Sequence, residues 1–598
     1  MNSEPAKTYQ SNIDVYTEKA EKLSKITRRI SVLRLFIFIT SVMLVYLFAV
    51  QDNAVGIVGS LVIGIALFVY LIKRHSAVIH EKKLAAALLK INEQENNALK
   101  HEFQQFDSGV SFIDHSHRYA SDLDLFGEGS LFQYLNRAST VSGSKTLAQL
   151  LCNPLLNKDE IKRNQRSVTE LKDKLSFRQK LGSIGLVYTE EETDDKKIRE
   201  WAVLPPEFGS IIYKILAVAI PLLTFGMIAL LSLSLITIQL FFLWLVVPWG
   251  ITGFSTTKTN RRHEMVSNTT ELLNKYAWLL QVIESQTFET EKLKDLSKRL
   301  YIKNTSAGQS IHKLKSILTA LDNRLNFVSW GVLNGLFLWD ILQMIRLESW
   351  QKIHREKISD WFDVISEMDV LCSFANFAYN NPEAVIPEID DEVDHIDAVE
   401  LGHPLIPGNV RVNNDFRIAP GEFMIITGAN MAGKSTYLRT IGASLILAMC
   451  GAPVIAGQFS FKPIDLHTSI RTTDSLFKNE SYFYAELKRL GKIIGALRSG
   501  KKMFIILDEI LKGTNSKDKH KGSEALLKQF ISLNTSGIVA THDVSLGVLE
   551  SQFPKHIRNR CFEVDIHGNE LSFDYKIRDG VSQNMNATLL MKKMGITI

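Results

Sequence analysis

Gly428-Ala-Asn-Met-Ala-Gly-Lys-Ser-Thr436 matches the phosphate-binding pattern G-x-x-x-x-G-K-[ST] at every defined position. The apolar residues 423–427 before it are typical of a buried strand, and residues 436–449 after it are typical of a helix. In such a unit the main-chain N–H groups turn inward and the helix N-terminus adds partial positive charge. The segment therefore predicts a polyphosphate site formed by Gly428, Ala429, Asn430, Met431, Ala432, Gly433, Lys434, Ser435 and Thr436.

Two later apolar runs end in residues that suit phosphate hydrolysis. Residues 503–507 are followed by Asp508 and Glu509, and Asp508 lies 74 residues after Lys434. Asp508 is expected to hold Mg²⁺ together with the Ser435 hydroxyl, and Glu509 to polarise the attacking water as general base. The other run, residues 537–541, is followed by His542, which is expected to hydrogen-bond the γ-phosphate or to orient the water. A plain polar residue at a strand end is the alternative. In this order, the three segments predict Mg²⁺-dependent ATP hydrolysis.

These motifs together resemble the ATPase domain of the MutS family of DNA mismatch repair proteins, which belongs with the ABC-type ATPases. Residues 427–442 (TGANMAGKSTYLRTIG) are similar to the family's TGPNMxGKST loop, residues 508–516 (DEILKGTNS) to its DEIGRGTS, and residues 540–543 (ATHD) to its ATH element. Leu511-Lys512 replaces the family's Gly-Arg, and residues 517–522 replace its acidic-Gly continuation. Neither departure touches a phosphate ligand, so ATP binding is still expected. The departures concern the coupling between subunits.

The resemblance implies further site residues and a partner subunit. Ser481, in the segment NESYF, matches the serine that reaches the γ-phosphate of the partner subunit in that family; a helix N-cap is the alternative. His403 lies in a Gly-His-Pro turn similar to the family's RHP, and Tyr575 matches an adenine-side position. Because an ABC-type site is completed by a segment of another subunit, the resemblance implies a homodimer in which Ser481 acts in trans.

The composition excludes several classes of protein. The chain has 598 residues, of which 22% are charged and 45% hydrophobic, so it is neither a single small binding module nor a disordered chain. The net charge of +5 is too small over this length to indicate nucleic acid by itself. The four cysteines are widely spaced and form no Cys/His cluster, so they indicate neither a disulfide framework nor a zinc site.

Two apolar islands indicate a membrane protein. Residues 35–50 and 54–72 carry no charge and are separated only by Gln51-Asp52-Asn53, which predicts a helical hairpin. Residues 215–254 also carry no charge and suit two crossings, although packed core helices are the alternative. In a third stretch, residues 327–345, the polar Asn334 and Asp340 favour a packed helix over a span.

The charges that flank these islands predict their orientation. Basic residues precede the first hairpin (Arg28, Arg29 and Arg34), follow it (Lys73 and Arg74) and follow the second hairpin (Lys258, Arg261 and Arg262), whereas the short turns carry no Lys or Arg. By the positive-inside rule, both hairpins start and finish in the cytoplasm. The sequence therefore predicts a multi-pass protein of the inner or cytoplasmic membrane with four membrane helices and with the ATPase domain and both termini in the cytoplasm.

The expected fold is an α/β P-loop ATPase domain of the ABC/MutS type at the C-terminus, preceded by a mostly α-helical core with transmembrane helical hairpins. In chain order we expect an N-terminal cytosolic helical segment (1–33), a transmembrane hairpin (34–72), a helical stalk (73–106), the first part of the MutS-like helical core (107–210), a second transmembrane hairpin (211–254), the helical core or lever (255–390) and the ATPase domain (391–598). We expect no mismatch-recognition domain, because the first hairpin occupies its place.

Two functional hypotheses follow. The first is a dimeric, membrane-anchored MutS-like ATPase that clamps duplex DNA through nonspecific phosphate contacts, which would weaken with salt. The second is a membrane-associated ABC-type ATPase switch in which the fold has no DNA role. A transporter fused to its own ATPase is less favoured, because two hairpins supply few helices and no charged residue inside them marks a pathway.

Overall fold

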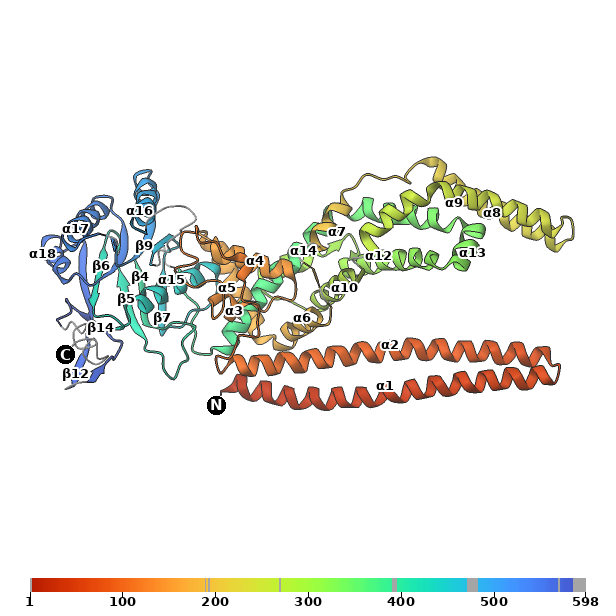
Figure 1. Cartoon of the computed structure of the whole chain (residues 1–598), viewed down its shortest axis with the longest axis horizontal. Coiled ribbons are helices and arrows are strands. Elements are labelled where there is room, and N and C mark those ends of the chain that lie inside the picture. The colour runs from red at the N-terminus through yellow and green to blue at the C-terminus, as the bar shows by residue number, and fades with distance from the viewer. Residues whose placement is uncertain are drawn as a thin grey trace. The chain divides into compact units, whose positions relative to one another are not determined.

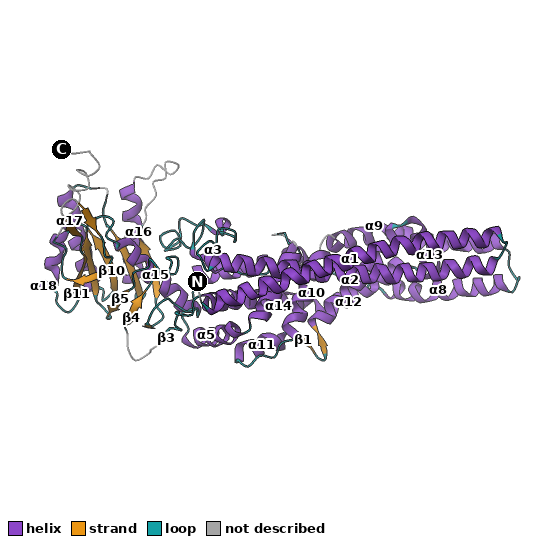
Figure 2. Cartoon of the chain, turned by 90° about the horizontal axis from the view of Figure 1, so that it is seen from below, coloured by secondary structure: helices purple, strands orange, loops and turns teal. Residues whose placement is uncertain are grey.

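The computed structural model describes residues 3–188, 190–191, 194–267, 270–389, 395–470, 482–512, 514–567 and 570–583 (Figure 1). The chain divides into two compact units, each assembled from separate stretches. One comprises Met1–Glu93, Ala138–Ser144 and Ser176–Asp369, and the other comprises Gln94–Arg137, Lys145–Leu175 and Val370–Ile598. The described part of the first unit is almost entirely helical, and the second unit holds the large sheets (Figure 2).

The first unit starts with two long helices, α1 (Glu4–Val50) and α2 (Ala54–Ala98), joined at residues 51–53. Along the middle of this pair, Leu23, Ile30, Leu71, Val78 and Ala85 form a buried apolar seam between the helices. Toward the turn, the apolar side chains of both helices are mostly exposed. The apolar hairpin expected at residues 34–72 thus lies within two longer helices. The helical stalk expected up to residue 106 ends at Ala98.

A second apolar pair is formed by α8 (Ile211–Ser232) and α9 (Ile238–Ser267). By length and apolar composition, four helices among the described residues are suited to cross a membrane, namely α1, α2, α8 and α9. A fifth candidate is the bent pair α13 (Phe327–Phe337) and α14 (Trp339–Asn380), whose axes differ by 78°. The helix expected over residues 327–345 is divided between α13 and α14, because the chain breaks at Leu338, which adopts φ +46°. The choice of a packed helix over a span stays a prediction.

The remaining elements of the first unit are shorter. They are α6 (Leu175–Val187), which begins at its edge, α7 (Asp194–Ala202), α10 (Thr270–Glu284), α11 (Glu291–Arg299), β1 (Tyr301–Ile302), β2 (Thr305–Ser306), α12 (Ala307–Asp322) and the 3-10 turn η2 (Asn323–Leu325). Residues 264–300 are thus divided among the end of α9, α10 and α11. Ser306 caps the first turn of α12, because its hydroxyl accepts a hydrogen bond from the Gln309 N–H.

The second unit is organised around a six-stranded sheet with the strand order β14-β11-β6-β10-β9-β8. Its strands are β6 (Phe423–Gly428), β8 (Asp465–Ser469), β9 (Met503–Asp508), β10 (Ser536–Thr541), β11 (Ile557–Phe562) and β14 (Ile577–Asp579). All neighbours pair in parallel except β11 and β14. Every residue of β6 and β9 is buried, as expected for strands covered on both faces.

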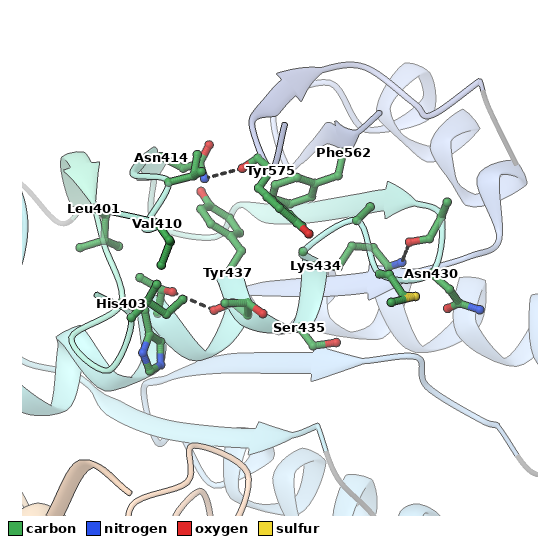
Figure 3. A pocket seen from close by; sticks show the side chains of 18 of the residues that line it. Leu401, His403, Val410, Asn414, Asn430, Lys434, Ser435, Tyr437, Phe562 and Tyr575 are labelled. Atoms are coloured by element: carbon green, nitrogen blue, oxygen red, sulfur yellow. Dashed lines mark hydrogen bonds between the residues drawn. The ribbon is translucent and has the colours of Figure 1, made fainter. Parts of the chain in front are cut away.

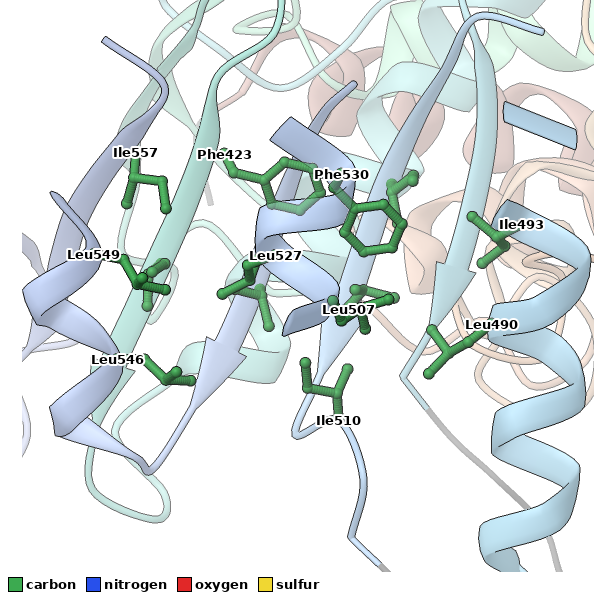
Figure 4. Close-up of a cluster of buried hydrophobic side chains, with 14 of the residues drawn as sticks. Phe423, Leu490, Ile493, Leu507, Ile510, Leu527, Phe530, Leu546, Leu549 and Ile557 are labelled. Carbon is green, nitrogen blue, oxygen red and sulfur yellow. The ribbon is translucent and has the colours of Figure 1, made fainter. Parts of the chain in front are cut away.

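Helices cover this sheet and complete its core. They are α15 (Lys434–Cys450), α16 (Tyr482–Arg498), α17 (Ser516–Ser532), α18 (Leu549–Gln552) and the 3-10 turn η4 (Val544–Val548). One apolar cluster joins the sheet to α16, α17 and α18 (Figure 4). Within it the Phe423 ring on β6 stacks on the Phe530 ring of α17, with centroids 5.2 Å apart. Burial of each such ring stabilises the fold by about 1.5–3 kcal/mol.

A smaller sheet and several short helices complete the second unit. The smaller sheet has the order β3-β7-β4-β5, and β12 pairs with β13 as a ribbon. Their bounds are β3 (Glu388–Ile389), β4 (Ile396–Leu401), β5 (Asn414–Ile418), β7 (Gln458–Phe461), β12 (Asp565–His567) and β13 (Glu570–Ser572), and the helices are η1 (Val110–Phe112), α3 (Leu131–Leu135), α4 (Val141–Cys152) and α5 (Lys158–Asp173). Because β6, β10 and β9 are adjacent and parallel, the segments after their carboxyl ends meet at one edge of the large sheet.

Candidate active site

The loop between β6 and α15 approaches other segments of the same chain so closely that it requires glycine at two positions. A Cβ atom on Gly428 would lie 2.8 Å from the carbonyl oxygen of Phe562. At Gly433 φ is +105°, and a Cβ atom would lie 3.1 Å from the Tyr575 ring. Gly433 is followed at once by the 17-residue helix α15, whose first N–H groups have no partner within the helix. The loop and the helix start therefore form an anion-binding concavity.

Lys434 places a buried ammonium group against this loop. Its Nζ donates hydrogen bonds to the carbonyl oxygens of Gly428, at 2.7 Å, and Ala429, at 2.8 Å. Burial lowers the pKa of Lys434 to about 8, although the nearby carboxylates of Asp508 and Glu509 act in the opposite direction. The ammonium is thus held by weak neutral acceptors, and a polyphosphate would be a much stronger partner for it.

Ser435 and Asp508 form a second polar contact at the base of the loop. The Ser435 hydroxyl donates to Asp508 Oδ2 over 2.5 Å. Asp508 Oδ1 is buried and has no hydrogen-bond partner among the residues that the structure describes. Burial raises the pKa of the Asp508 carboxyl. A hydroxyl oxygen beside a carboxylate with an unused oxygen suits Mg²⁺, which binds oxygen ligands and keeps several of its waters.

Glu509 and His542 meet at the ends of β9 and β10. His542 Nε2 lies 2.7 Å from Glu509 Oε1, and Lys512 Nζ lies 3.2 Å from Glu509 Oε2. The close approach of the His542 ring is the main reason that the pKa of Glu509 is lowered to about 2. Glu509 adopts φ +50°, and its main-chain N–H donates to the Ala540 carbonyl, which fixes the turn. In this arrangement the carboxylate is an ionised acceptor that can orient a water molecule.

A cavity of about 430 Å³ lies over the loop (Figure 3). Its polar floor is formed by residues 429–436 together with Glu509. His403 and Tyr575, two of the residues named from the sequence, line its side. Burial lowers the pKa of His403 to about 4, so its imidazole is neutral at neutral pH. The cavity therefore joins a polar floor to a wall with aromatic character.

Most of the residues predicted from sequence converge here. Ala429 to Thr436, His403, Tyr575 and Glu509 line the cavity. Asp508 contacts the floor through Ser435, and His542 contacts it through Glu509. Ser481 lies outside the residues that the structure describes, so its predicted role in trans stays a prediction.

The cavity also has an apolar wall that the sequence did not reveal. It is formed by Leu401, Ile406, Val410, Val412 and Phe562. Asn414 on β5 supports Tyr575 next to this wall, because its Nδ2 donates to the Tyr575 carbonyl over 2.9 Å and its Oδ1 accepts from the Ile577 N–H. Ile406, Val410 and Val412 lie between β4 and β5 and carry no periodic signal, so only the three-dimensional fold identifies them.

Asp122 is a further residue that the sequence did not single out. It is buried, and its Oδ2 accepts from Thr468 Oγ1 at 2.5 Å, from the Ile470 N–H at 3.2 Å and from Arg489 Nη2 at 2.7 Å. Its carbonyl oxygen accepts from Arg439 Nε of α15 at 3.0 Å. One residue of the segment before α3 thereby ties together the helix after the phosphate loop, the end of β8 and α16.

Two family models match this chain. The model for MutS domain V matches residues 424–595, which include the loop, Asp508, Glu509 and His542. The model for MutS domain III matches residues 114–195, which include Asp122. The chain belongs to the MutS family. Domain V of MutS is of the ATPase type, and the match to its model includes the loop that forms the floor of the cavity.

Curated proteins of the MutS family are similar to part of this chain. The DNA mismatch repair protein MutS of Thermotoga neapolitana is 29% identical over 237 residues, which cover 39% of this chain and 29% of that protein. MutS protein homolog 4 of Homo sapiens is 31% identical over 236 residues, which cover 38% of this chain and 24% of that protein. The DNA mismatch repair protein MutS of Caldanaerobacter subterraneus is 31% identical over 261 residues, which cover 43% of this chain and 28% of that protein. The chain thus spans less than a third of the length of each of these relatives.

Proposed function

We propose that this MutS-family chain binds and hydrolyses ATP. The observation that carries the proposal is the convergence on one cavity of three segments far apart in the sequence, namely the loop before α15, the end of β9 and the end of β10. Phosphoryl transfer to water demands little covalent work from a protein, because positioning and charge neutralisation supply most of the catalysis. This cavity offers main-chain N–H groups, an ammonium group and carboxylates, which are the groups that such a reaction needs.

Each group has a distinct role in this proposal. The main-chain N–H groups of the loop and the Lys434 ammonium bind the phosphate oxygens, so the lysine exchanges its two carbonyl partners for charged ones. Ser435 and Asp508 would hold Mg²⁺, which when bound neutralises phosphate charge. Glu509, oriented by His542, accepts a hydrogen bond from the attacking water. Tyr575 and the apolar wall provide a surface for the base.

The proposal extends to a homodimer. In the resemblance on which the sequence prediction rests, Ser481 completes the site of the partner subunit. Leu511 and Lys512, which replace the family's Gly-Arg, lie beside the site. The Leu511 N–H donates to Glu486 Oε1 of α16 over 2.7 Å, and Lys512 pairs with Glu509. These contacts link the catalytic carboxylate to α16, the helix that follows Ser481 in the chain, and they support coupling of hydrolysis to the neighbouring subunit.

The macromolecule that this ATPase binds is proposed to be duplex DNA. Two of the relatives named above are DNA mismatch repair proteins, and the match to MutS domain III extends the resemblance beyond the ATPase domain. We infer a clamp that holds DNA by nonspecific phosphate contacts. The chain is proposed to be anchored in the cytoplasmic membrane by α1, α2, α8 and α9, with the ATPase domain and both termini in the cytoplasm.

The four apolar helices also favour a second candidate function. An ATP-driven switch that acts on membrane partners would need these helices and would need no DNA. The two candidates share the nucleotide chemistry and differ only in the partner.

One experiment separates the two candidates. The full chain is reconstituted in lipid nanodiscs, and its binding to a labelled duplex is measured by fluorescence anisotropy from roughly 50 to 200 mM salt, the range over which phosphate contacts weaken strongly. A DNA clamp binds at low salt, loses affinity steeply with salt and hydrolyses ATP faster with DNA. Lys434→Ala serves as the control for ATP-dependent effects. ATP hydrolysis without DNA binding at low salt would exclude the clamp and leave the membrane switch.

A further inference from the structure

Helix α13 packs against the two apolar helices α8 and α9. The Phe337 ring of α13 lies 5.7 Å from the Phe225 ring of α8, centroid to centroid. Trp249 Nε1 of α9 donates to the Gly331 carbonyl over 2.9 Å. A Cβ atom on Gly335 would lie 3.2 Å from the same indole nitrogen, so α13 approaches α9 as closely as a glycine permits. Every one of these contacts is with the uncharged part of α8 or α9.

The depth of α13 follows from the positions it contacts. Leu245 and Trp249 lie 7 and 11 residues after Ile238, the first residue of α9. At 1.5 Å per residue, these contacts lie about 10–16 Å from the turn between α8 and α9, roughly half of the ~30 Å hydrocarbon thickness of a bilayer. The 11 residues of α13 span only about 16 Å, too short for a crossing. If α8 and α9 cross a membrane, α13 lies within it.

The face of α13 that α8 and α9 leave uncovered is apolar. Phe327 is 83% exposed and Val328 is 71% exposed, and Val332 one turn further is also exposed. Helix α13 contains no charged residue. An uncovered phenylalanine and two valines on one short helix are costly in water, at about 25 cal/mol per Å² of apolar surface. They suit contact with hydrocarbon, as do the exposed apolar side chains of α8 and α9 beside them.

The polar groups at the break between α13 and α14 have hydrogen-bond and ion-pair partners within the protein. The Asp340 N–H donates to Asn334 Oδ1 over 3.0 Å, and Asn334 Nδ2 donates to Asp340 Oδ1 over 3.1 Å. Arg324 Nη1 pairs with Asp340 Oδ2 at 3.2 Å, and all three side chains are largely shielded from solvent. Non-helical backbone is tolerated at membrane depth only where its polar groups have protein partners. The side chains of Asn334, Asp340 and Arg324 provide such partners. A bend exposed to water would not need them, because water would supply the hydrogen bonds.

We propose that α13 is a membrane-embedded re-entrant helix whose face formed by Phe327, Val328 and Val332 contacts lipid acyl chains. The occupant is assigned as lipid because this face continues the exposed apolar surface of α8 and α9 and carries no polar group for a protein or nucleic-acid partner. The inference rests on the proposed membrane anchoring through α8 and α9. It adds a contact of the cytosolic helices α12 and α14 with the bilayer through the segment that joins them.

Photo-crosslinking in the full chain tests the proposal. A benzoylphenylalanine side chain replaces Phe327 or Val332 in protein reconstituted into phosphatidylcholine–phosphatidylglycerol vesicles. Leu222, an exposed residue of α8, serves as the site that reports membrane insertion, and Ile353, an exposed residue of α14, serves as the site outside the apolar region. After irradiation, lipid adducts are quantified by mass spectrometry. We expect adducts at Leu222, Phe327 and Val332 and none at Ile353.

The outcomes distinguish the lipid contact of α13 from the membrane anchoring through α8 and α9. Lipid adducts at Leu222 without adducts at Phe327 and Val332 would overturn the assignment of α13 while the anchoring by α8 stands. Protein adducts in place of lipid adducts at Phe327 and Val332 would also overturn it, because they would show a protein occupant. Absence of lipid adducts at Leu222 would reject the membrane anchoring and, with it, the re-entrant helix.

Discussion

Replacement of Asp122 by Asn tests how the region matched by MutS domain III is joined to the nucleotide-binding domain. The substitution keeps the size of the side chain and removes its charge. In the native chain one carboxylate oxygen accepts from Thr468, Ile470 and Arg489. An asparagine retains one acceptor oxygen, but its amide group presents a donor to surroundings that are rich in donors.

The size of the effect follows from these three contacts. Hydrogen bonds to a charged group contribute about 1.5–3 kcal/mol, and neutral ones about 0.5–1.5 kcal/mol, so each contact loses roughly 1 kcal/mol. Three contacts give about 3 kcal/mol, and Asp122 is only 1% exposed, so solvent does not compensate for the loss. Since 1.4 kcal/mol corresponds to a factor of ten, local opening of the end of β8 should become roughly a hundredfold more frequent.

Native-state hydrogen exchange of the full chain measures this opening. A peptide that covers residues 465–470 reports the end of β8, including the Ile470 N–H. The matched control is Asp124→Asn in the same segment. Its carboxylate is more exposed and lies 3.6 Å from Arg439, a separation at which such a pair contributes at most about 1 kcal/mol. Wild-type exchange in the Asp122→Asn chain, or equal acceleration by Asp124→Asn, would refute this reasoning.

Three further predictions concern the nucleotide site. Lys434→Ala should abolish ATP binding in calorimetry, whereas Lys501→Ala at the exposed surface should leave it unchanged; equal affinities would contradict the assignment of the loop. At about pH 8.5, ATP binding should take up about three quarters of a proton, because burial lowers the pKa of Lys434 to about 8 and phosphates favour its charged form. Near pH 7 the uptake should fall to about a tenth, and calorimetry in buffers of different ionisation enthalpy would reveal an absence of this pH dependence. Asp508→Asn should bind ATP but lose the increase in affinity caused by Mg²⁺, since it removes the buried carboxylate beside Ser435; an unchanged Mg²⁺ effect would place the metal elsewhere.

The core of the site was predictable because its parts obey local rules. The strand before the loop was expected at residues 423–427 and is β6 at Phe423–Gly428, while α15 begins two residues earlier than expected. Asp508, Glu509 and His542 come together because β6, β10 and β9 are parallel neighbours, and apolar strand patterns followed by polar residues carry that information.

The remaining features depend on contacts that leave no local pattern. Asp122 lies 346 residues from Thr468 and 367 residues from Arg489, so no spacing rule connects them. The break at Leu338 contains neither Gly nor Pro, and periodicity continues through it. The hydrogen bonds between Asn334 and Asp340 stabilise the bend, whereas in the sequence these two polar residues only favoured a packed helix over a span.

Release of phosphate from ATP by the purified full chain is the most direct test of the site. Hydrolysis and bound nucleotide are measured together, with Mg²⁺ or EDTA, for the wild type and for Glu509→Gln. We expect Mg²⁺-dependent phosphate release by the wild type, and bound ATP with little release by Glu509→Gln, because this substitution removes the charged acceptor for water and leaves the phosphate-binding groups in place. Equal phosphate release by both proteins, or none by either when ATP is bound, would contradict the assignment of this cavity as a hydrolytic site.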